Sequence, residues 1–325
     1  MESPILKVSV VIPTRNRSAC LRRLLLSILK QSILPNEVIV IDDSDGLETK
    51  NLVELLSDRF LGIGIKLRHI MPDGNLKSIS KARNLGAKEA EGDIVIFLDD
   101  DVIIDENYVK EILKVFDMYP NALGVQGTVI NLRYSHLDNS IKRVFYYWHA
   151  EAEKCRMLPS GKTTFAYSPS GIIPCEWLFG LNVAYKREVF KEFSFNERLL
   201  GYSLGEDKEL SYKIYKKYPG SLFLTPYARV YHYPPSSNNM SKQKIYIITA
   251  YPIGFFFNNI EQTLKNKAIF FWSEIGRIIL GIIWSLPNAT KIKHLITSYF
   301  EAIKHINEIK NENYSFIFRI EETPN

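Results

Sequence analysis

The sequence predicts an α/β protein, with a mostly parallel, doubly wound sheet flanked by helices and a helical extension at the C-terminus. Short apolar runs rich in β-branched residues alternate with amphipathic helical patterns through the first 130 residues. Polar residues follow each of these runs, as at the carboxyl ends of parallel strands that face a ligand. The last 85 residues or so lack this alternation and carry long apolar and aromatic helical patterns instead.

Composition limits the classes of function. The chain has 325 residues, of which 46% are hydrophobic and 24% charged, which excludes a disordered or fibrous protein. Its net charge of +5 is spread along the sequence. We therefore expect no nucleic-acid partner, whereas an anionic substrate or an anionic membrane surface fits. The three cysteines show no ligand spacing and predict reduced thiols in a cytoplasmic protein without a signal peptide.

Three strand–helix pairs are predicted first. The strands are expected at 8–12, 37–41 and 65–70, and the helices at 18–29, 49–60 and 78–89. Polar loops follow the strands at 13–17, 42–46 and 71–75. None of these loops carries G-x-G-x-x-G or G-x-x-x-x-G-K-[ST], so the common dinucleotide and P-loop sites are excluded.

The fourth predicted strand, Ile94–Leu98, ends in three adjacent carboxylates, Asp99, Asp100 and Asp101. Neighbouring carboxylates repel one another, so this arrangement is most easily explained by a cation at the strand end. Oxygen ligands suit Mg²⁺ and Mn²⁺, which predicts a divalent metal beside a phosphate ester. The alternative is a solvated acidic turn that caps the following helix.

The later elements are less regular. A helix is predicted at 102–120, a strand at 123–130, a helix with Lys186 in its first turn, an amphipathic helix opened by Glu206 and Asp207, and a last strand at 222–230. Residues 131–172 are aromatic and basic without clear periodicity, and we interpret them as a mobile or acceptor-facing insertion.

Five pieces of this sequence resemble the family 2 glycosyltransferases, in the family's order and spacing across residues 7–235. They are VVIPTRN (10–16), VIDDS (40–44), ARNLG (82–86), FLDDD (97–101) and GED (205–207). The resemblance implies the Rossmann-like GT-A fold, with a catalytic domain at 1–240 and a helical extension at 241–325. The catalytic domain would have a nucleotide-sugar half at about 1–130 and an acceptor half at about 131–240. The loop at 42–46 departs from the commoner Asp-Asp-Gly-Ser, and nothing in 131–172 matches a segment we can name.

By the same resemblance, roles can be assigned to individual residues. The nucleotide-sugar donor would contact Pro13, Thr14, Arg15, Asn16, Asp43, Arg83, Asp99, Asp100 and Gly180. The metal would bind Asp101, with Asp99 and His232 as further ligands, and Trp177 would line the acceptor cleft. Each assignment has a plainer alternative: Asp43 capping a helix, Arg83 on the surface, His232 as a structural residue, or Trp177 and Gly180 as core and turn.

Asp207 is the predicted catalytic base, and Glu206 is the alternative. Inversion needs a carboxylate on the face opposite the leaving group, where it takes the proton of the acceptor hydroxyl. The competing explanation is that acidic residues at a helix start offset the helix dipole, by about 0.3–1 kcal/mol. Glu206 fits that explanation better than Asp207.

The predicted function is therefore inverting transfer of a hexose from a nucleoside diphosphate sugar to a hydroxyl of a glycan or lipid-linked acceptor, with Mn²⁺ or Mg²⁺ on the diphosphate. UDP is favoured as the nucleotide, and GDP or dTDP are alternatives. A nucleotidyltransferase is the second enzyme class, but residues 13–16 lack its Gly-rich loop. A non-catalytic nucleotide- or carbohydrate-binding relative is the third hypothesis, and the retained Asp triplet and Glu206–Asp207 pair argue against it.

A linker is predicted at 234–239, followed by helices at 244–257, 268–286 and 291–310. The middle helix approaches the length of a membrane span, but Glu274 and Arg277 would each cost about 2.5–3.5 kcal/mol on insertion, so we predict no transmembrane helix. Two interpretations stay open. The extension lies on the cytoplasmic face of a membrane, which Trp272 and Trp284 favour, or it packs against the catalytic domain or the second subunit of a homodimer.

Overall fold

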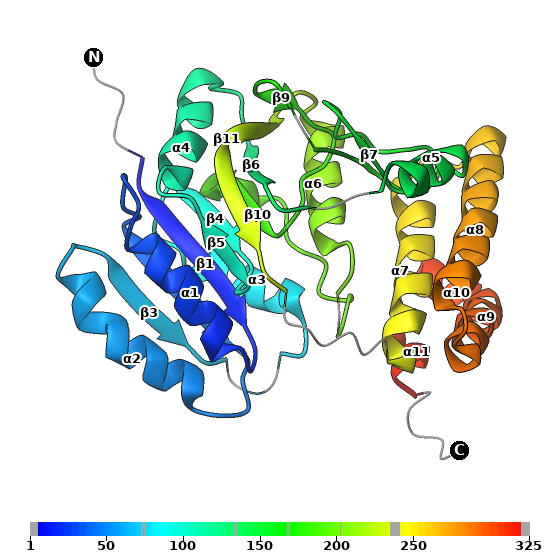
Figure 1. The fold of residues 1–325 in the computed structure, drawn as a ribbon, viewed down its shortest axis with the longest axis horizontal. Helices are drawn as coiled ribbons and strands as arrows, with labels where there is room; N and C mark the ends of the chain where they lie inside the picture. Colours follow the sequence, from blue (N-terminus) through cyan, green and yellow to red (C-terminus); the bar gives the residue numbers. More distant parts are fainter. Residues whose placement is uncertain are drawn as a thin grey trace.

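The computed structural model describes residues 6–72, 74, 76–132, 135–167, 169–201, 203–234 and 241–319. Its centre is a nine-stranded sheet of order β3-β2-β1-β4-β10-β6-β11-β5, with β9 added on β11 (Figure 1). The first four strands are β1 (Val8–Thr14), β2 (Glu37–Asp42), β3 (Lys66–Ile70) and β4 (Ile94–Leu98), and they pair in parallel. The predicted strand–helix alternation is confirmed here.

The second half of the sheet is mixed. Strand β10 (Asn182–Lys186) runs antiparallel between β4 and β6 (Gly124–Val129), and β11 (Leu222–His232) is parallel to β6. The short strands β5 (Val102–Ile104) and β9 (Ile173–Pro174) are antiparallel to β11. The sheet is therefore wholly parallel from β3 to β4, whereas its other half mixes one parallel pair, β6 and β11, with the antiparallel strands β10, β5 and β9.

Helices cover both faces of the sheet, as a doubly wound architecture requires. On one face, α1 (Ser18–Ile28), α2 (Glu48–Leu61) and α4 (Tyr108–Met118) share an apolar cluster with the sheet. On the other, a second cluster joins the sheet to α3 (Ile79–Glu89), the 3-10 helix η1 (Arg187–Lys191) and α6 (Glu206–Lys217). The leucines of α1, and Leu210 and Ile214 one turn apart on α6, contribute to the buried faces.

Three predicted elements were wrong in detail. The helix expected at 102–120 begins only at Tyr108, because Val102–Ile104 pair with residues 230–232 at the sheet edge. Lys186 ends β10 instead of opening a helix. The insertion at 131–172 has regular structure: α5 (His136–Val144) and a two-stranded sheet of β7 (His149–Glu151) and β8 (Thr164–Ala166). Residues 73 and 75 of the third loop and 235–239 of the expected linker lie outside the described residues.

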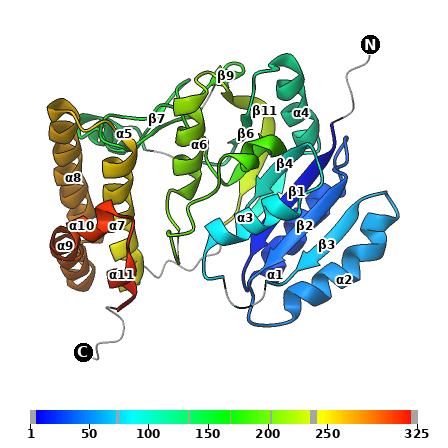
Figure 2. The ribbon, with the colours of Figure 1, turned by 180° about the vertical axis from the view of Figure 1, so that it is seen from behind.

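The C-terminal helices form a layer beside the catalytic part (Figure 2). They are α7 (Lys242–Asn259), α8 (Leu264–Ser285), α9 (Ala289–Lys304), α10 (Ile306–Lys310) and α11 (Ser315–Arg319). Helix α7 lies at the centre of a third apolar cluster that also includes Leu199 and is packed by Met157 and Tyr212. The extension is thus docked on the chain's own catalytic part. Among the described helices, α8 alone is long and apolar enough to cross a membrane, judged by length and composition.

Candidate active site

A cavity of about 1520 Å³ opens at the carboxyl ends of β1 and β4 and extends to α7. Every predicted site residue lines it except Asn16. The fold therefore brings together side chains from seven separate stretches of sequence. The predicted residues found in the lining are Pro13, Thr14, Arg15, Asp43, Arg83, Asp99, Asp100, Asp101, Trp177, Gly180, Glu206, Asp207 and His232.

Arg83 connects the donor side of the cavity to the helix that carries the predicted base. Its side chain is only 2% exposed, and Nη1 donates to Glu206 Oε1 at 2.6 Å. Its Nη2 donates to Asp99 Oδ1 at 2.8 Å and to the Gly180 carbonyl at 2.9 Å. A guanidinium presents several donors in a fixed plane, so one buried arginine can fix three partners at once. The surface position considered as the alternative for Arg83 is excluded.

Gly180 lies between Arg83 and Asp207. A Cβ atom at this position would come within 2.7 Å of Arg83 Nη1 and of Asp207 Cβ, so a larger residue would displace both. The Gly180 N–H donates to Asp207 Oδ2 at 2.7 Å, and the Lys208 N–H donates to Asp207 Oδ1 at 2.7 Å. Two backbone amides thus orient the Asp207 carboxylate at the start of α6.

Glu206 turns to Arg83, whereas Asp207 turns to the Gly180 amide. Burial, together with the nearby negative charge of Asp207, raises the pKa of Glu206 to about 8, although the Arg83 guanidinium acts in the opposite direction. A carboxyl group that pairs with a buried arginine is a better structural support than a proton acceptor. The two adjacent acidic residues therefore have different contacts: Glu206 supports Arg83, and Asp207 is held by backbone amides.

This raised pKa predicts a pH dependence of stability. Glu206 has an ordinary pKa of 4.5 and a folded-state pKa of about 8, so the folded protein holds a proton that the unfolded chain loses. Its contribution is complete below pH 4.5 and is lost as the pH rises towards 8. Melting temperatures measured from pH 5 to 9 should fall more steeply for the wild type than for Glu206→Gln. Parallel curves would contradict the assignment.

Thr14 and Arg17 hold two members of the Asp triplet, Asp100 and Asp101. Thr14 Oγ1 donates to Asp100 Oδ2 at 2.7 Å, and Arg17 Nη1 lies 3.2 Å from Asp100 Oδ1 and 3.3 Å from Asp101 Oδ2. Burial raises the pKa of Asp100 to about 6, against the effects of Arg17 and Thr14. Sequence analysis missed Arg17, although its position in the polar loop after the first strand was the available signal.

Asp101 and His232 form the part of the site best suited to a metal. His232 Nε2 lies 3.3 Å from Asp101 Oδ1, and this buried oxygen has no hydrogen bond within the described chain. Burial acts to raise the pKa of Asp101, but His232 and Arg17 lower it below its usual value. Asp99 is instead paired with Arg83.

Across the described residues, no group of three or more His, Cys, Asp or Glu is arranged to hold a metal ion. This pattern does not conflict with a catalytic Mg²⁺ or Mn²⁺. Such ions are commonly held by one or two carboxylates together with substrate phosphates and water, not by a complete protein cage. A free carboxylate oxygen on Asp101 with an imidazole beside it fits an ion whose remaining ligands come from a diphosphate.

The loops after β1 and β2 enclose the edge of the cavity. Asp43 accepts the N–H groups of Leu76 and Lys77, at 2.7 and 3.1 Å, and each carboxylate oxygen keeps a further lone pair. Arg15 lies 3.8 Å from Asp43. The structure does not bring Asn16 into the cavity, because its side-chain amide exchanges hydrogen bonds with Asp45.

Trp177 lies at the floor of the cavity, only 8% exposed, and its indole N–H donates to the Thr164 carbonyl at 2.7 Å. The neighbouring Phe179, whose ring centre is 6.3 Å away, is 38% exposed. Trp177 therefore supports the wall, and Phe179 offers the more accessible aromatic face. Sequence analysis did not single out Phe179.

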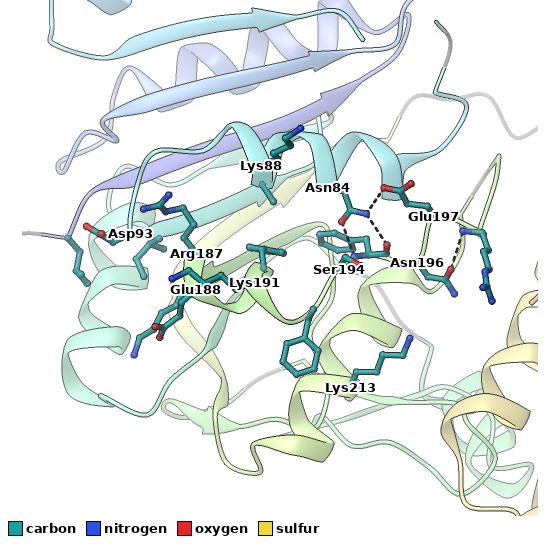
Figure 3. A pocket seen from close by; sticks show the side chains of 18 of the residues that line it. Asn84, Lys88, Asp93, Arg187, Glu188, Lys191, Ser194, Asn196, Glu197 and Lys213 are labelled. Atoms are coloured by element: carbon teal, nitrogen blue, oxygen red, sulfur yellow. Dashed lines mark hydrogen bonds between the residues drawn. The ribbon is translucent and has the colours of Figure 1, made fainter. Parts of the chain in front are cut away.

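Asn84 follows Arg83 in the sequence, but it lines a different groove (Figure 3). Its amide donates to the Phe195 carbonyl and accepts from the Phe195 N–H, both at 2.9 Å. A separate groove of about 1200 Å³ lies here, lined by exposed Lys88, Arg187 and Lys191, and it shares only Glu312 with the active-site cavity. The motif at 82–86 thus contributes residues to both the groove and the active-site cavity.

Comparison with known proteins identifies a matching family. A family model described as glycosyl transferase family 2 matches residues 9–178, more than half of the chain. A beta-1,3-glucosyltransferase of Campylobacter jejuni, named for the acceptor GalNAc(5)-diNAcBac-PP-undecaprenol, is 38% identical over 101 residues, or 29% of each chain. The chain covers about a fifth to a half of the length of the curated relatives it matches.

Two solved structures share the fold. S. aureus TarS 1-349 in complex with UDP-GlcNAc superposes with a TM-score of 0.57 at 17% identity, covering 95% of this chain and 88% of that one. GalNAc-T7 with UDP, GalNAc and Mn²⁺ gives a TM-score of 0.57 at 19% identity, covering 85% of this chain and 55% of that one. At these identities the similarity shows the fold alone.

Proposed function

The chain belongs to glycosyl transferase family 2, and from that premise we propose that it transfers a hexose from a nucleoside diphosphate sugar to a hydroxyl of a saccharide or lipid-linked saccharide, with inversion at the anomeric carbon. UDP is the favoured nucleotide. One observation carries the proposal: the oriented Asp207 carboxylate and the Asp101–His232 pair line the same cavity. A base and a leaving-group site in one cavity are what a single displacement requires.

In this proposal Asp207 accepts the proton of the acceptor hydroxyl, whose oxygen attacks the anomeric carbon from the face opposite the diphosphate. Hydrogen bonds from the Gly180 and Lys208 amides fix the direction of the accepting oxygen. Glu206 is a positioning residue, because it acts through Arg83. Phe179 and Trp177 supply an apolar wall for a sugar ring.

The donor would lie along the loops after β1, β2 and β4. Asp43 and Arg15 border the base and ribose, while Asp99 and Asp100 line the path to the phosphates. Arg17, which contacts both Asp100 and Asp101, would offer its guanidinium to a phosphate oxygen. Asp101 and His232 would hold a divalent ion, which supplies positive charge to the departing diphosphate when it is bound.

The solved structures with UDP-GlcNAc and with UDP and Mn²⁺ support a UDP-sugar and a divalent metal for this chain as well. The undecaprenol-linked acceptor named for the Campylobacter relative supports a lipid-linked saccharide. A cytoplasmic location at the membrane surface fits both the UDP-sugar donor and the lipid-linked acceptor.

Thermal unfolding with UDP, GDP and dTDP, each with and without MnCl₂, tests the donor and the metal together. A ligand at 100 times its Kd stabilises the native state by about 2.7 kcal/mol. We expect the melting temperature to rise by several degrees with UDP and Mn²⁺ and to rise less with UDP alone. Asp101→Ala should remove the metal-dependent part. An unchanged melting temperature with all three nucleotides would contradict the proposed function.

A further inference from the structure

Helix α8 buries two charged residues beside Phe270 and Leu280, and it exposes a row of other large apolar residues. Its buried face includes Ser273, Glu274 and Arg277. The opposite face exposes Phe271, Trp272, Ile275, Ile279 and Ile283, each between 43% and 60% accessible. A helix on the surface of a soluble domain shows the reverse pattern. A contiguous row of exposed apolar side chains marks a surface that binds a membrane, a ligand or another protein.

The buried polar network explains why α8 is held in this orientation. Lys162 Nζ lies 2.8 Å from Glu274 Oε1, while Arg277 Nε and the Tyr299 hydroxyl donate to Glu274 Oε2 at 2.9 and 2.7 Å. Arg277 also donates to the Ile248 carbonyl at 2.7 Å. Burial opposes ionisation, but the charges of Arg277 and Lys162 lower the pKa of Glu274 to about 2. Rotating α8 to bury its apolar face would leave these buried charges without partners.

Helix α5, from the insertion that sequence analysis left unassigned, lies beside α8 (Figures 1 and 2). The Trp272 indole donates to the Val144 carbonyl at 3.0 Å, and Phe145 packs against Trp272. Gly276 has no room for a side chain because Phe145 occupies that space. On α5, Leu137 and Val144 are 73% and 63% exposed, so the apolar surface continues from one helix to the other.

The charges that flank α8 are mostly positive, and Asp138 of α5 is paired with Lys142. Lysines stand at 265 and 267 at the start of α8, and at 291 and 293 shortly after its end. Between residues 262 and 300 the only acidic residue is Glu274, which is buried. Within the described part of the chain, none of these four lysines forms an ion pair. An apolar face with lysines at both ends matches an anionic lipid surface, whose headgroups attract the cations while the acyl region accepts the apolar side chains.

We propose that α5 and α8 form a docking face, defined by Leu137, Ile141, Val144, Phe271, Trp272, Ile275, Ile279 and Ile283, that lies in the interfacial region of an anionic phospholipid bilayer. Membrane contact by this face does not depend on the proposed function. Only the entry of a lipid-linked acceptor beside it rests on that function. Tyr147 and Trp148 follow α5 directly, and they line the active-site cavity together with Ile248 and Arg277. The cavity therefore ends beside the docking face, where the saccharide of a lipid-linked acceptor would enter while its lipid stayed in the bilayer.

Vesicle flotation of the full chain tests this proposal. The probes are vesicles of phosphatidylcholine alone and of phosphatidylcholine with 30% phosphatidylglycerol. We expect the wild type to float with the anionic vesicles, and Ile275→Glu/Ile279→Glu to bind them at least roughly tenfold more weakly, because two charges would enter the apolar layer. Leu55→Glu/Leu61→Glu is the matched control, since these leucines of α2 are 75% and 72% exposed on the far side of the sheet. It should float as the wild type does.

Charge reversal at Lys265 and Lys293 should weaken binding to the anionic vesicles and reduce its salt dependence. Sedimentation without lipid tests the alternative that a second copy of the chain covers the docking face. A wild type that is dimeric, fails to float with either composition, and becomes monomeric in Ile275→Glu/Ile279→Glu would overturn the proposal and assign the face to a second copy of the chain. A monomeric wild type that does not float would also overturn it.

The UDP-dependent thermal shift separates this inference from the proposed function. The docking face contains no residue placed in the nucleotide site, so Ile275→Glu/Ile279→Glu should keep the full shift. Loss of vesicle binding with an intact shift supports the docking face. Vesicle binding by a protein that shows no nucleotide shift would refute the proposed function and leave the docking face standing.

Discussion

Replacing Asp207 by Asn should lower kcat by about 10²–10⁴ and leave UDP binding unchanged. General acid–base catalysis contributes factors of this size. The substitution keeps the shape of the side chain and one oxygen for the Gly180 or Lys208 N–H, so the cavity should be little altered. Asp207 forms no hydrogen bond with the Asp triplet among the described residues, so the direct contacts of the nucleotide site should survive the change. Initial rates with saturating donor, together with the UDP-dependent thermal shift, measure the two effects separately.

Glu206→Gln is the natural control for this experiment. It changes the adjacent residue in the same way but affects the partner of Arg83 instead of the base. We expect Glu206→Gln to retain substantially more turnover than Asp207→Asn. If Asp207→Asn turned over as fast as the wild type, Asp207 would not be the base. If Glu206→Gln were the slower of the two, the roles of the two residues would have to be exchanged.

Replacing Arg83 by Met should destabilise the folded protein by roughly 3–5 kcal/mol, because removing one member of a buried ionic network leaves the others uncompensated. The guanidinium is the shared partner of Asp99, Glu206 and the Gly180 carbonyl. For a protein of this size the expected fall in melting temperature is on the order of 10 °C. Chemical denaturation would give the free energy of unfolding directly.

A double-mutant cycle distinguishes the network from a simple loss of packing. If Arg83 and Glu206 support each other, Arg83→Met/Glu206→Gln should be more stable than the sum of the two single changes predicts, by about 0.5–3 kcal/mol. Strictly additive free energies would mean that the two side chains are energetically independent. Lys88→Met, an exposed change on the same helix, should cost little and serves as the matched control.

The part of the fold that could be predicted is the part specified by local pattern. The runs that became β1, β2 and β4 are continuous and apolar, so each identified a buried strand without knowledge of its neighbours. The Asp triplet was likewise contiguous. Together with the resemblance to the family 2 glycosyltransferases, these local signals led to a set of predicted residues that nearly all line one cavity.

The rest depended on partners far away in the sequence. Val102–Ile104 became a strand only because residues 230–232 lie beside it, and a three-residue apolar run carries no periodicity of its own. Arg17 reaches carboxylates 83 and 84 residues later in the chain. Glu274 and Arg277 were recognised as incompatible with a membrane span, but that they face Lys162 could not be read from spacing. The roles assigned to individual site residues stay predictions until the variants are measured.

The position of β10 at the middle of the sheet has a consequence for synthesis on the ribosome. Strand β4 pairs with β1 on one side, and on the other its partner is β10, which is made more than eighty residues later. A nascent chain that has emerged only as far as residue 178 presents β4 as an open, wholly apolar edge, which is a template for association with other chains. Gly180 and Asp207 are also still missing at that stage. A fragment expressed only to the end of the family match should therefore aggregate, and we expect the boundary of a foldable catalytic fragment to lie beyond β11.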